Sequence, residues 1–462
     1  MGLDGRRVLE KPLYRSDRRQ RHAARPPSLK SLHQRVSAGQ ELRPDHAIGV
    51  PGSVSGYPHH AIGQSAVLNH SPQETGLVIE GGELFAPESF GVASIAAIAG
   101  VTTWIGEGAT DRLAGLPGLK TIDARGMRII PGLIDQHIHF LGGGDANGPL
   151  GRVPELTPDM LLSTGTTTAV GVLGVDNETR DLRLLLRKAH ELRNSGVSAY
   201  LYSGGMPLPA RHLMGSVCAD VSFIDQVIGA KSAVAERLHP NRSWHDLAEL
   251  AGELMRARAL SGKAAVLHCH VGSLPEAIEP LMRLVTELGM PPDQIVPTHV
   301  NRTPDFSPVF GQAIAFAKNG GTIDMTCCVS RIDGNLAGVD VPEAVKHCLE
   351  EGVPLGNITI STDGNIPATV RDIKGRALGY RVVPPSVLFR DVMRLVHESG
   401  LALEKALTLA TTNVARVLGL AGRKGQIALG HDADYVLLGP DDSIQMVIAR
   451  GRIVFRRGEQ GA

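Results

Sequence analysis

The chain of 462 residues is longer than one compact core usually holds, so we expect one large domain together with a smaller one. Hydrophobic residues make up 42% of the sequence and charged residues 20%, a balance that is ordinary for a globular enzyme. The formal net charge is zero at pH 7, which argues against a general electrostatic attraction to nucleic acid or to a membrane surface.

The first segment, residues 1–73, differs in composition from the rest of the chain. It is rich in Arg, Pro, His and Ser, and it shows neither a helical period nor the alternation of a strand. We predict a disordered basic tail. An Arg-rich arm for targeting or for nucleic-acid binding is the alternative, and the interspersed Asp4, Glu10 and Asp17 argue against it.

Residues 74–130 and 425–462 share a pattern of short apolar runs separated by turn residues. Such runs are typical of β-strands. The candidate strands cover residues 77–79, 94–98 and 101–105 in the first segment, and 434–438, 444–447 and 453–455 in the last. Two β-rich ends that flank a long middle predict a small β-sandwich domain formed from both chain ends.

The middle of the chain, residues 131–424, alternates short apolar runs with amphipathic stretches. The predicted buried strands cover residues 167–170, 199–202, 264–267, 295–296, 322–323 and 358–360. The predicted helices cover residues 182–192, 244–260, 275–288, 310–319, 341–351 and 387–397. This alternation predicts an α/β fold in which a parallel sheet closes into a (β/α)8 TIM barrel.

Two histidines, His137 and His139, end the first apolar strand of this middle segment. Residues i and i+2 of a strand point to one face, so the two imidazoles converge. Imidazole nitrogens are natural ligands for zinc. Two histidines on a solvated strand edge are the alternative, but here an apolar run precedes the pair and three glycines, residues 142–144, follow it. The sequence therefore predicts a metal site.

Four further polar residues close apolar runs: Lys231, His270, His299 and Asp363. The active sites of TIM barrels lie at the C-terminal ends of the strands, and a barrel of roughly 250 residues has about 31 residues per strand–helix unit. The successive intervals from His137 to Asp363 are 94, 39, 29 and 64 residues, close to three, one, one and two units. This spacing predicts ligands on strands 1, 4, 5, 6 and 8.

This arrangement of His-x-His, Lys, His, His and Asp resembles that of the binuclear amidohydrolases. More closely, residues 76–458 resemble the bacterial isoaspartyl dipeptidases, and the basic tail lies outside the resemblance. The motifs that carry it are residues 132–144, 227–231, 297–302 and 361–365.

The resemblance implies two divalent metal ions, with zinc as the expected metal, that activate a shared water molecule for attack on an amide. Carbon dioxide would convert Lys231 into a carbamate, an anionic bridge between the ions. Asp363 would bind one metal and carry a proton from the attacking water to the leaving amine. The histidines form one pair for each ion: His137 with His139, and His270 with His299.

One assignment on strand 5 stays open. His268 lies two residues before His270 on the same strand face, so either imidazole can be the ligand. We favour His270 because it is nearer to the strand end and precedes residues 271–272, as in the dipeptidase pattern. His268 would then support the site or belong to the core.

The resemblance also implies contacts to the substrate. The forked guanidinium of Arg302 suits the α-carboxylate of a dipeptide. Met206 takes the place of a family tyrosine that polarises the scissile carbonyl, although Tyr202 lies four residues earlier. Asp145 is adjacent to the position of a family glutamate that meets the substrate amine, and Val175 replaces a threonine. The metal ligands are thus kept while the substrate contacts differ.

We therefore predict a binuclear metal-dependent amidohydrolase that cleaves β-aspartyl dipeptides or a related small amide. An amidohydrolase that acts on N-acyl amino acids or cyclic amides is the first alternative. A non-catalytic scaffold on the same barrel is the second, but such proteins usually lose metal ligands and all six are present here.

The five cysteines include no CxxC pair, which argues against a disulfide framework and favours a reducing compartment. No stretch approaches 18 consecutive apolar residues, and the N-terminal segment lacks the apolar part of a secretion signal. We expect a cytoplasmic homo-oligomer that acts on a small molecule, without a nucleic-acid or membrane partner.

Overall fold

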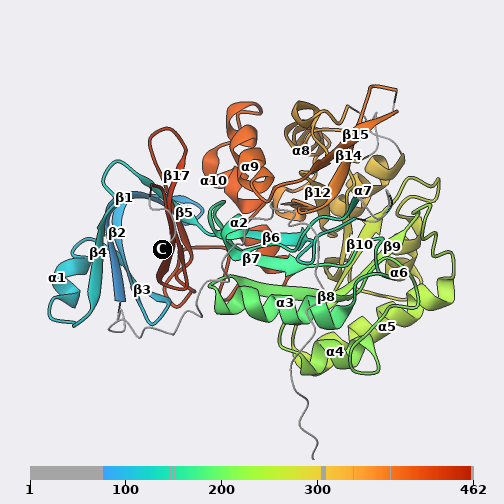
Figure 1. Cartoon of the computed structure of the whole chain (residues 1–462), viewed down its shortest axis with the longest axis horizontal. Helices are drawn as coiled ribbons and strands as arrows, with labels where there is room; N and C mark the ends of the chain where they lie inside the picture. The colour runs from blue at the N-terminus through green and yellow to red at the C-terminus, as the bar shows by residue number, and fades with distance from the viewer. Residues whose placement is uncertain are drawn as a thin grey trace, which may run out of the picture. The chain divides into compact units, whose positions relative to one another are not determined.

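The computed structural model describes residues 76–144, 148, 151–302, 308–336, 338–374 and 376–458 (Figure 1). The predicted tail, residues 1–73, lies outside the described residues. Two eight-stranded sheets and one two-stranded hairpin organise the described part of the chain. None of its helices combines the length and the apolar composition that crossing a bilayer requires. All five cysteines are free in the described part of the chain.

One sheet contains parallel strands that follow one another in chain order from β6 to β13. Its first and last strands meet, because Ile138 of β6 forms a parallel bridge with Gly364, just beyond β13. This is the (β/α)8 barrel that the strand–helix alternation predicted. Its strands are β6 Leu133–Ile138, β7 Thr166–Gly171, β8 Ser198–Gly204, β9 Val227–Val234, β10 Val266–Val271, β11 Ile295–Thr298, β12 Ile323–Thr326 and β13 Ile358–Ser361.

Helices lie outside the barrel strands, as α3 shows beside β7 and β8 (Figure 1). The six predicted helices are confirmed with small shifts at their ends: α3 Leu182–Asn194, α5 Trp244–Ser261, α6 Glu279–Thr286, α7 Pro308–Lys318, α8 Val341–Glu350 and α9 Val387–His397. Five shorter helices were not predicted: α1 Ala109–Leu113, α2 Pro158–Leu162, α4 Val217–Phe223, α10 Leu403–Thr408 and α11 Thr412–Val417. Their few turns give too short a pattern for a periodicity to be recognised.

Helix α3 illustrates how local sequence sets these elements. The carboxylate of Asp181 accepts hydrogen bonds from the backbone N–H groups of Arg183 and Leu184 at 2.8 and 2.9 Å. It thereby satisfies two of the donors that a helix start leaves free. Leu185 and Leu192, two turns apart, are fully buried, so the apolar face of the helix packs inward.

Strand β9 is longer than the sequence analysis predicted. It continues to Val234, so Lys231 lies inside the strand rather than at its end, and the prediction that Lys231 closes its strand is wrong. The pairing of β9 with β10 aligns Lys231 with His268, two residues before His270. The order of the ligand-bearing strands nevertheless agrees with the spacing: β6, β9, β10, β11 and β13 are the first, fourth, fifth, sixth and eighth of the barrel.

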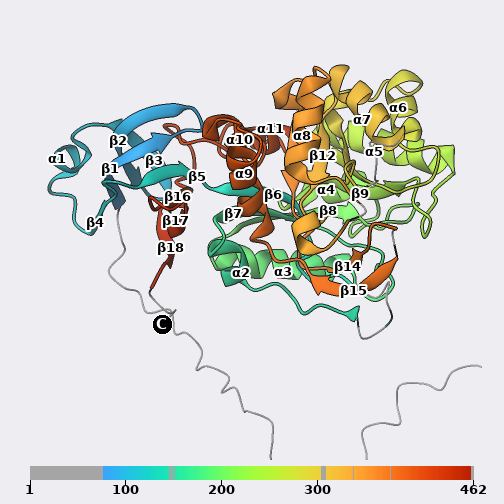
Figure 2. The ribbon, with the colours of Figure 1, turned by 90° about the horizontal axis from the view of Figure 1, so that it is seen from above.

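The other large sheet joins strands from both ends of the described chain. Its order is β18–β17–β16–β5–β1–β2–β3, with β4 beside β1, and Figure 2 shows β5 next to β16 and β17. Its strands are β1 Gly76–Phe85, β2 Ser89–Ile98, β3 Val101–Gly106, β4 Leu119–Asp123, β5 Arg128–Pro131, β16 Tyr435–Leu438, β17 Ile444–Ala449 and β18 Arg452–Arg456.

Side chains from both ends share one apolar core in this sheet. Ile79 and Ile129 from the first segment pack in one cluster with Tyr435 and Ile448 from the last. The prediction that both ends build one small β unit is confirmed. Its boundaries at residues 74, 131 and 425 stay predictions.

A separate hairpin follows the last barrel strand. It pairs β14 Pro367–Arg371 with β15 Ala377–Val382 in antiparallel fashion. Arg381 anchors it, because its guanidinium donates to the Asp333 carboxylate at 2.8 Å. The sequence analysis did not predict this hairpin, since β15 is largely exposed and its side chains do not alternate between apolar and polar.

A buried ion pair joins the barrel segment to the second sheet. Nζ of Lys424 lies 2.5 Å from the carboxylate of Asp434 and 2.8 Å from that of Asp432, and it donates to Ser198 Oγ at 2.7 Å. Lys424 is only 4% exposed. Removal of one partner leaves the other charges buried without compensation, which is strongly destabilising.

We expect Lys424→Met to lower the free energy of unfolding by about 3 kcal/mol, because two carboxylates lose their cation. Chemical denaturation measures the change. Lys346→Met on α8 is the matched control, since this lysine is exposed and its replacement should change stability by less than about 0.5 kcal/mol. Equal effects of the two substitutions would contradict the structural role of Lys424.

Candidate active site

The six predicted metal ligands gather at the C-terminal side of the barrel, where such folds carry their active sites. All six are buried, with no more than 9% of any residue exposed. His137 lies in β6 and His139 directly follows it, Lys231 lies in β9, His270 in β10, His299 directly after β11 and Asp363 two residues after β13. The strands thus bring together residues that are far apart in the sequence.

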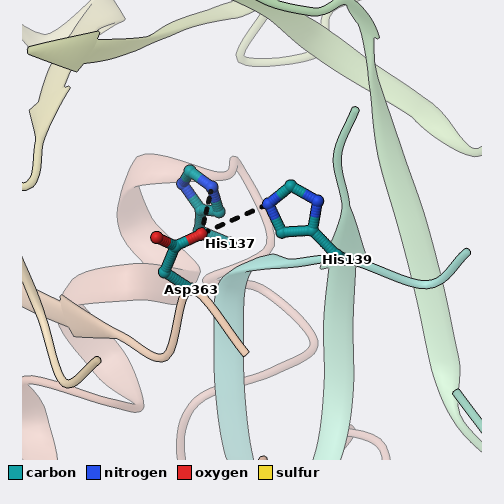
Figure 3. A group of neighbouring side chains, drawn as sticks. All are labelled: His137, His139 and Asp363. Carbon is teal, nitrogen blue, oxygen red and sulfur yellow. Dashed lines mark ion pairs between the residues drawn. The ribbon is translucent and has the colours of Figure 1, made fainter. Parts of the chain in front are cut away.

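The tightest cluster contains His137, His139 and Asp363 (Figure 3). Oδ1 of Asp363 lies 3.3 Å from Nε2 of His137 and 3.2 Å from Nε2 of His139. One potential ligand atom from each residue lies within 4.8 Å of the other two. Two imidazole nitrogens and a carboxylate oxygen around one point form a donor set that suits a divalent ion such as zinc.

Lys231 reaches this cluster from β9. Its Nζ lies 3.0 Å from Nε2 of His137. Burial lowers the pKa of Lys231 to about 8, although the carboxylate of Asp363 acts in the opposite direction. A larger fraction of this amine is therefore neutral near pH 7 than for an exposed lysine, and the neutral amine is the form that reacts with carbon dioxide.

The imidazoles of His270 and His299 stand side by side, with ring centroids 4.7 Å apart. Nε2 of His299 lies 3.9 Å from Oδ2 of Asp363, which links this pair to the first cluster. Burial lowers the pKa of His270 to about 4 and that of His299 well below its usual range. Both rings are therefore neutral and offer lone pairs to a metal.

The backbone is unusual at two of these residues. Asp363 has φ 47° and His299 has φ 67°, in the left-handed region that side chains other than glycine rarely adopt. Such conformations cost of order 1–3 kcal/mol each and cluster at functional sites. Here they occur where the chain leaves β13 and β11, and the surrounding barrel holds them in place.

The carboxylate of Asp363 is ionised. Burial alone would raise its pKa, but the imidazoles of His299, His137 and His139 outweigh burial and hold the pKa well below its usual range. Sγ of Cys328 lies 3.6 Å from Oδ2, the carboxylate oxygen that does not face His137 and His139. Asp363 thus presents one oxygen to the histidine pair and the other to a thiol.

A buried hydrogen-bond network connects three of the ligand-bearing strands. The carboxylate of Asp324, on β12, accepts hydrogen bonds from Gln136, Thr298 and Ser361, each at 2.6 Å. These donors come from β6, β11 and β13, and each stands one or two residues before a predicted ligand. The network therefore fixes the strands that present the ligands to one another.

The two histidines of β10 occupy different positions. His268 is fully buried, and its Nε2 lies 2.8 Å from Nδ1 of His137, the nitrogen that does not face Asp363. His270 lies nearer to the strand end and contacts the ring of His299. This arrangement favours His270 as the metal ligand, which stays a prediction.

The predicted substrate contacts differ in exposure and in their distance from the candidate metal ligands. Arg302 is exposed, and its Nη1 lies 3.1 Å from Nε2 of His270. Val175 is half-buried. It follows Gly174, where an added Cβ atom would lie 2.8 Å from Cε1 of His139. Asp145 lies outside the described residues.

Met206 and Tyr202 are both buried, at 2% and 0% exposed. The Tyr202 ring stacks on His268, with centroids 5.0 Å apart and planes inclined by 14°. The stacked position holds Tyr202 against a histidine that is itself fully buried. The alternative that Tyr202 takes over the role of the substrate-polarising tyrosine therefore finds no support in its position.

Two residues that follow barrel strands, Glu236 after β9 and Asn177 after β7, were missed by the sequence analysis. Oε2 of Glu236 lies 3.0 Å from Nε2 of His270, and this contact lowers the pKa of Glu236 to about 2. Asn177 is buried, and neither its side-chain oxygen nor its nitrogen has a hydrogen-bond partner among the described residues. Glu236 stands two residues after the end of β9 and Asn177 six residues after the end of β7. Their positions shortly after a strand are the signal that the sequence offers.

Comparison with known proteins agrees with this geometry. The Amidohydrolase family matches residues 128–454. The crystal structure of a β-aspartyl dipeptidase from Fervidobacterium islandicum AW-1, in complex with β-Asp-Leu dipeptide, is 31% identical in sequence. The superposition covers 84% of this chain and 98% of that chain, with a TM-score of 0.76. The resemblance inferred from the metal motifs is thereby confirmed.

More distant curated relatives have other names. Imidazolonepropionase of Kosmotoga olearia is 24% identical over 382 residues, which cover 73% of this chain and 86% of that protein. Allantoinase of Rubrobacter xylanophilus is 26% identical over 377 residues, which cover 70% of this chain and 77% of that protein. Both matches cover 70% or more of this chain, and the two relatives carry different enzyme names.

Proposed function

Because this chain belongs to the Amidohydrolase family and is a hydrolase of amide or peptide bonds, we propose that it cleaves β-aspartyl dipeptides at a site with two divalent metal ions. The observation that carries this proposal is the convergence of His137, His139 and Asp363, whose ligand atoms lie within 4.8 Å of one another. The 31% identity to a β-aspartyl dipeptidase across most of the chain supports the substrate class.

The buried side chains fit the metals that this family uses. Neutral imidazoles and an ionised carboxylate are the donor types that zinc prefers. His137, His139 and Asp363 would hold one ion, and His270 with His299 the other. Two bound ions would polarise the scissile carbonyl and make a water acidic enough to act as nucleophile at neutral pH.

Lys231 would bridge the two ions after carbamylation. Its neutral Nζ forms a bond to the carbon of carbon dioxide and releases a proton, which leaves an anionic carbamate. The lowered pKa and the 3.0 Å approach to His137 are compatible with this reaction. An unmodified ammonium cannot serve as a metal ligand, because it has no free lone pair.

Asp363 would move the proton. Its ionised carboxylate, in contact with the histidine pair, accepts a proton from the attacking water and donates it to the leaving amine. This role needs a base that is ionised before the attack and lies beside the metals. The low pKa of Asp363 meets the first condition, and its contacts meet the second.

The charges beside His270 suit a zwitterionic substrate. The Glu236 carboxylate and the Arg302 guanidinium lie 3.0 and 3.1 Å from the same ring nitrogen, Nε2 of His270, and carry opposite charges. A dipeptide carries an ammonium for the carboxylate and a carboxylate for the forked guanidinium. A neutral cyclic amide offers neither group, so the charge pattern favours the dipeptide.

A second candidate is hydrolysis of a cyclic amide. It is favoured by the apolar Met206 and Val175 at positions where the dipeptidase resemblance implies a phenol and a hydroxyl. It is also consistent with the similarity to an allantoinase and an imidazolonepropionase. The two candidates share the metal ligands and differ in how they use the charges of Glu236 and Arg302.

A substrate panel separates the candidates. We expect the zinc-loaded protein, prepared with bicarbonate, to cleave β-Asp-Leu faster than α-Asp-Leu, hydantoin or allantoin. Arg302→Met should raise the KM for β-Asp-Leu about tenfold or more, because a hydrogen bond between charged groups contributes about 1.5–3 kcal/mol. Arg258→Met, which removes an exposed guanidinium paired with Asp293 on the outer helix α5, is a control that should leave KM unchanged.

Turnover of the cyclic amides alone, with Arg302→Met equal to the unmodified protein, would reject the dipeptidase proposal in favour of the second candidate. Absence of turnover on the whole panel, with metal bound, would reject both.

A further inference from the structure

His268 makes a buried contact that the predicted ligand set does not explain. Its Nε2 lies 2.8 Å from Nδ1 of His137, and the two rings meet edge to face with centroids 4.9 Å apart. Neither ring is exposed. A buried nitrogen–nitrogen contact of this length is a hydrogen bond, so one ring donates a hydrogen and the other accepts it.

The neighbours of His137 indicate the direction of this bond for metal binding. On the opposite side of the ring, Nε2 lies 3.0 Å from Nζ of Lys231 and 3.3 Å from Oδ1 of Asp363, so it is the nitrogen that faces the other candidate ligands. A metal ion held there would take the lone pair of Nε2. In a neutral imidazole the hydrogen then lies on Nδ1, and it points at Nε2 of His268, which accepts it.

We propose that His268 is a positioning residue that fixes the tautomer and the ring orientation of His137 for metal binding. Histidine ligands of metals usually donate their second ring N–H to a carboxylate, a backbone carbonyl or a water. Here a neutral imidazole from β10 takes that place. The inference rests on the metal-binding part of the proposed function and extends it to a residue outside the ligand set.

Packing, rather than a second hydrogen bond, holds His268 in position. The Tyr202 ring lies almost parallel to it, with centroids 5.0 Å apart. Nδ1 of His268 has no hydrogen-bond partner among the described residues, and neither has the hydroxyl of Tyr202. The backbone pairing of His268 with Lys231 fixes its height in the barrel. His268 is thus placed for one contact, the one with His137.

The test compares two replacements of His268 in the full-length chain. His268→Gln keeps an acceptor, because its Oε1 takes the place of Nε2, whereas His268→Leu keeps only bulk. We expect His268→Leu to weaken Zn2+ affinity about 10–100-fold, as measured by competition with a chelator in the presence of bicarbonate, and His268→Gln to stay within about threefold. Thr168→Val, which removes another buried polar atom from the barrel, should leave the affinity unchanged.

A second measurement reports the tautomer directly. Long-range 1H–15N spectra of histidine-labelled, metal-free protein should show the hydrogen of His137 on Nδ1, in the unmodified protein and in His268→Gln. This readout needs neither metal nor substrate. It still decides the matter if His268→Leu does not fold, and it separates failure of this inference from failure of the proposed function.

Three results would overturn the inference. Unchanged Zn2+ affinity in folded His268→Leu would show that the contact has no effect on the metal site. Equal losses in His268→Gln and His268→Leu would show that His268 is itself a ligand or only fills space. A hydrogen on Nε2 of His137 in the metal-free protein would show that His268 does not accept it.

Discussion

Replacement of Asp363 by asparagine should reduce kcat by at least about 1000-fold on any substrate that the unmodified protein cleaves. An amide cannot accept the proton of the attacking water at neutral pH, and general acid–base catalysis contributes about 10²–10⁴-fold. The amide oxygen still coordinates a metal weakly, so Zn2+ content should fall by less than half. Steady-state kinetics and elemental analysis of the same preparation measure both quantities.

The control for this substitution is Asp293→Asn, which removes an exposed carboxylate paired with Arg258 outside the site. Its kcat should equal that of the unmodified protein. Asp363→Asn with more than a tenth of the original kcat and full metal content would show that another group moves the proton.

Replacement of Lys231 by alanine should remove the proposed carbamate bridge between the two proposed metal ions. The unmodified protein, grown with zinc and bicarbonate, should carry close to two divalent ions per chain, and Lys231→Ala should carry less than one. Turnover should fall more than about 100-fold, because loss of groups that merely orient metal ligands already costs 10–100-fold. The substitution leaves a buried space where the 2% exposed side chain stood.

Rescue of Lys231→Ala by short carboxylates tests the bridging role of Lys231 more directly. Acetate or propionate has the planar anionic end of a carbamate and fits the space that the lysine side chain leaves. We expect such an anion to restore part of the metal content and turnover of Lys231→Ala, and to do nothing for Lys346→Ala, an exposed lysine variant. Two bound ions and full turnover in Lys231→Ala without any added anion would exclude the bridging role.

The strand positions of the candidate ligands could be predicted because a TIM barrel repeats at a nearly constant interval. The distances from His137 to Lys231 and on to Asp363 are close to three and four times that interval, so the strand order followed from counting. Counting could not show that β9 extends past Lys231, because the polar Lys231 and Ser232 interrupt the apolar run, although both side chains are buried. The small β unit was predictable for a similar reason, because both chain ends carry the same short apolar runs.

The contacts of residues that follow the strands could not be predicted from the sequence pattern. Glu236 sits in an irregular segment after β9, and only the folded barrel shows that its carboxylate reaches His270. The position of Tyr202 shows a second limit. A residue count places Tyr202 near the predicted substrate contact at Met206. The pairing of β8 with β9 shifts register at Tyr202, which a residue count does not show, and the Tyr202 ring stacks on His268.

The pairing of β5 with β16 has a consequence for synthesis on the ribosome. β5 leaves the exit tunnel before the barrel and β16 after it, so translation of every barrel strand separates the two partners. Until β16 emerges, the strand partners of β5 among the described residues are Glu83 and Leu84 of β1, and its other edge is an open template for aggregation. The barrel can fold in the meantime, since domains form in the order of their synthesis. A stop codon between Asp363 and β16 would therefore release a chain that carries all six candidate ligands together with an uncovered β edge.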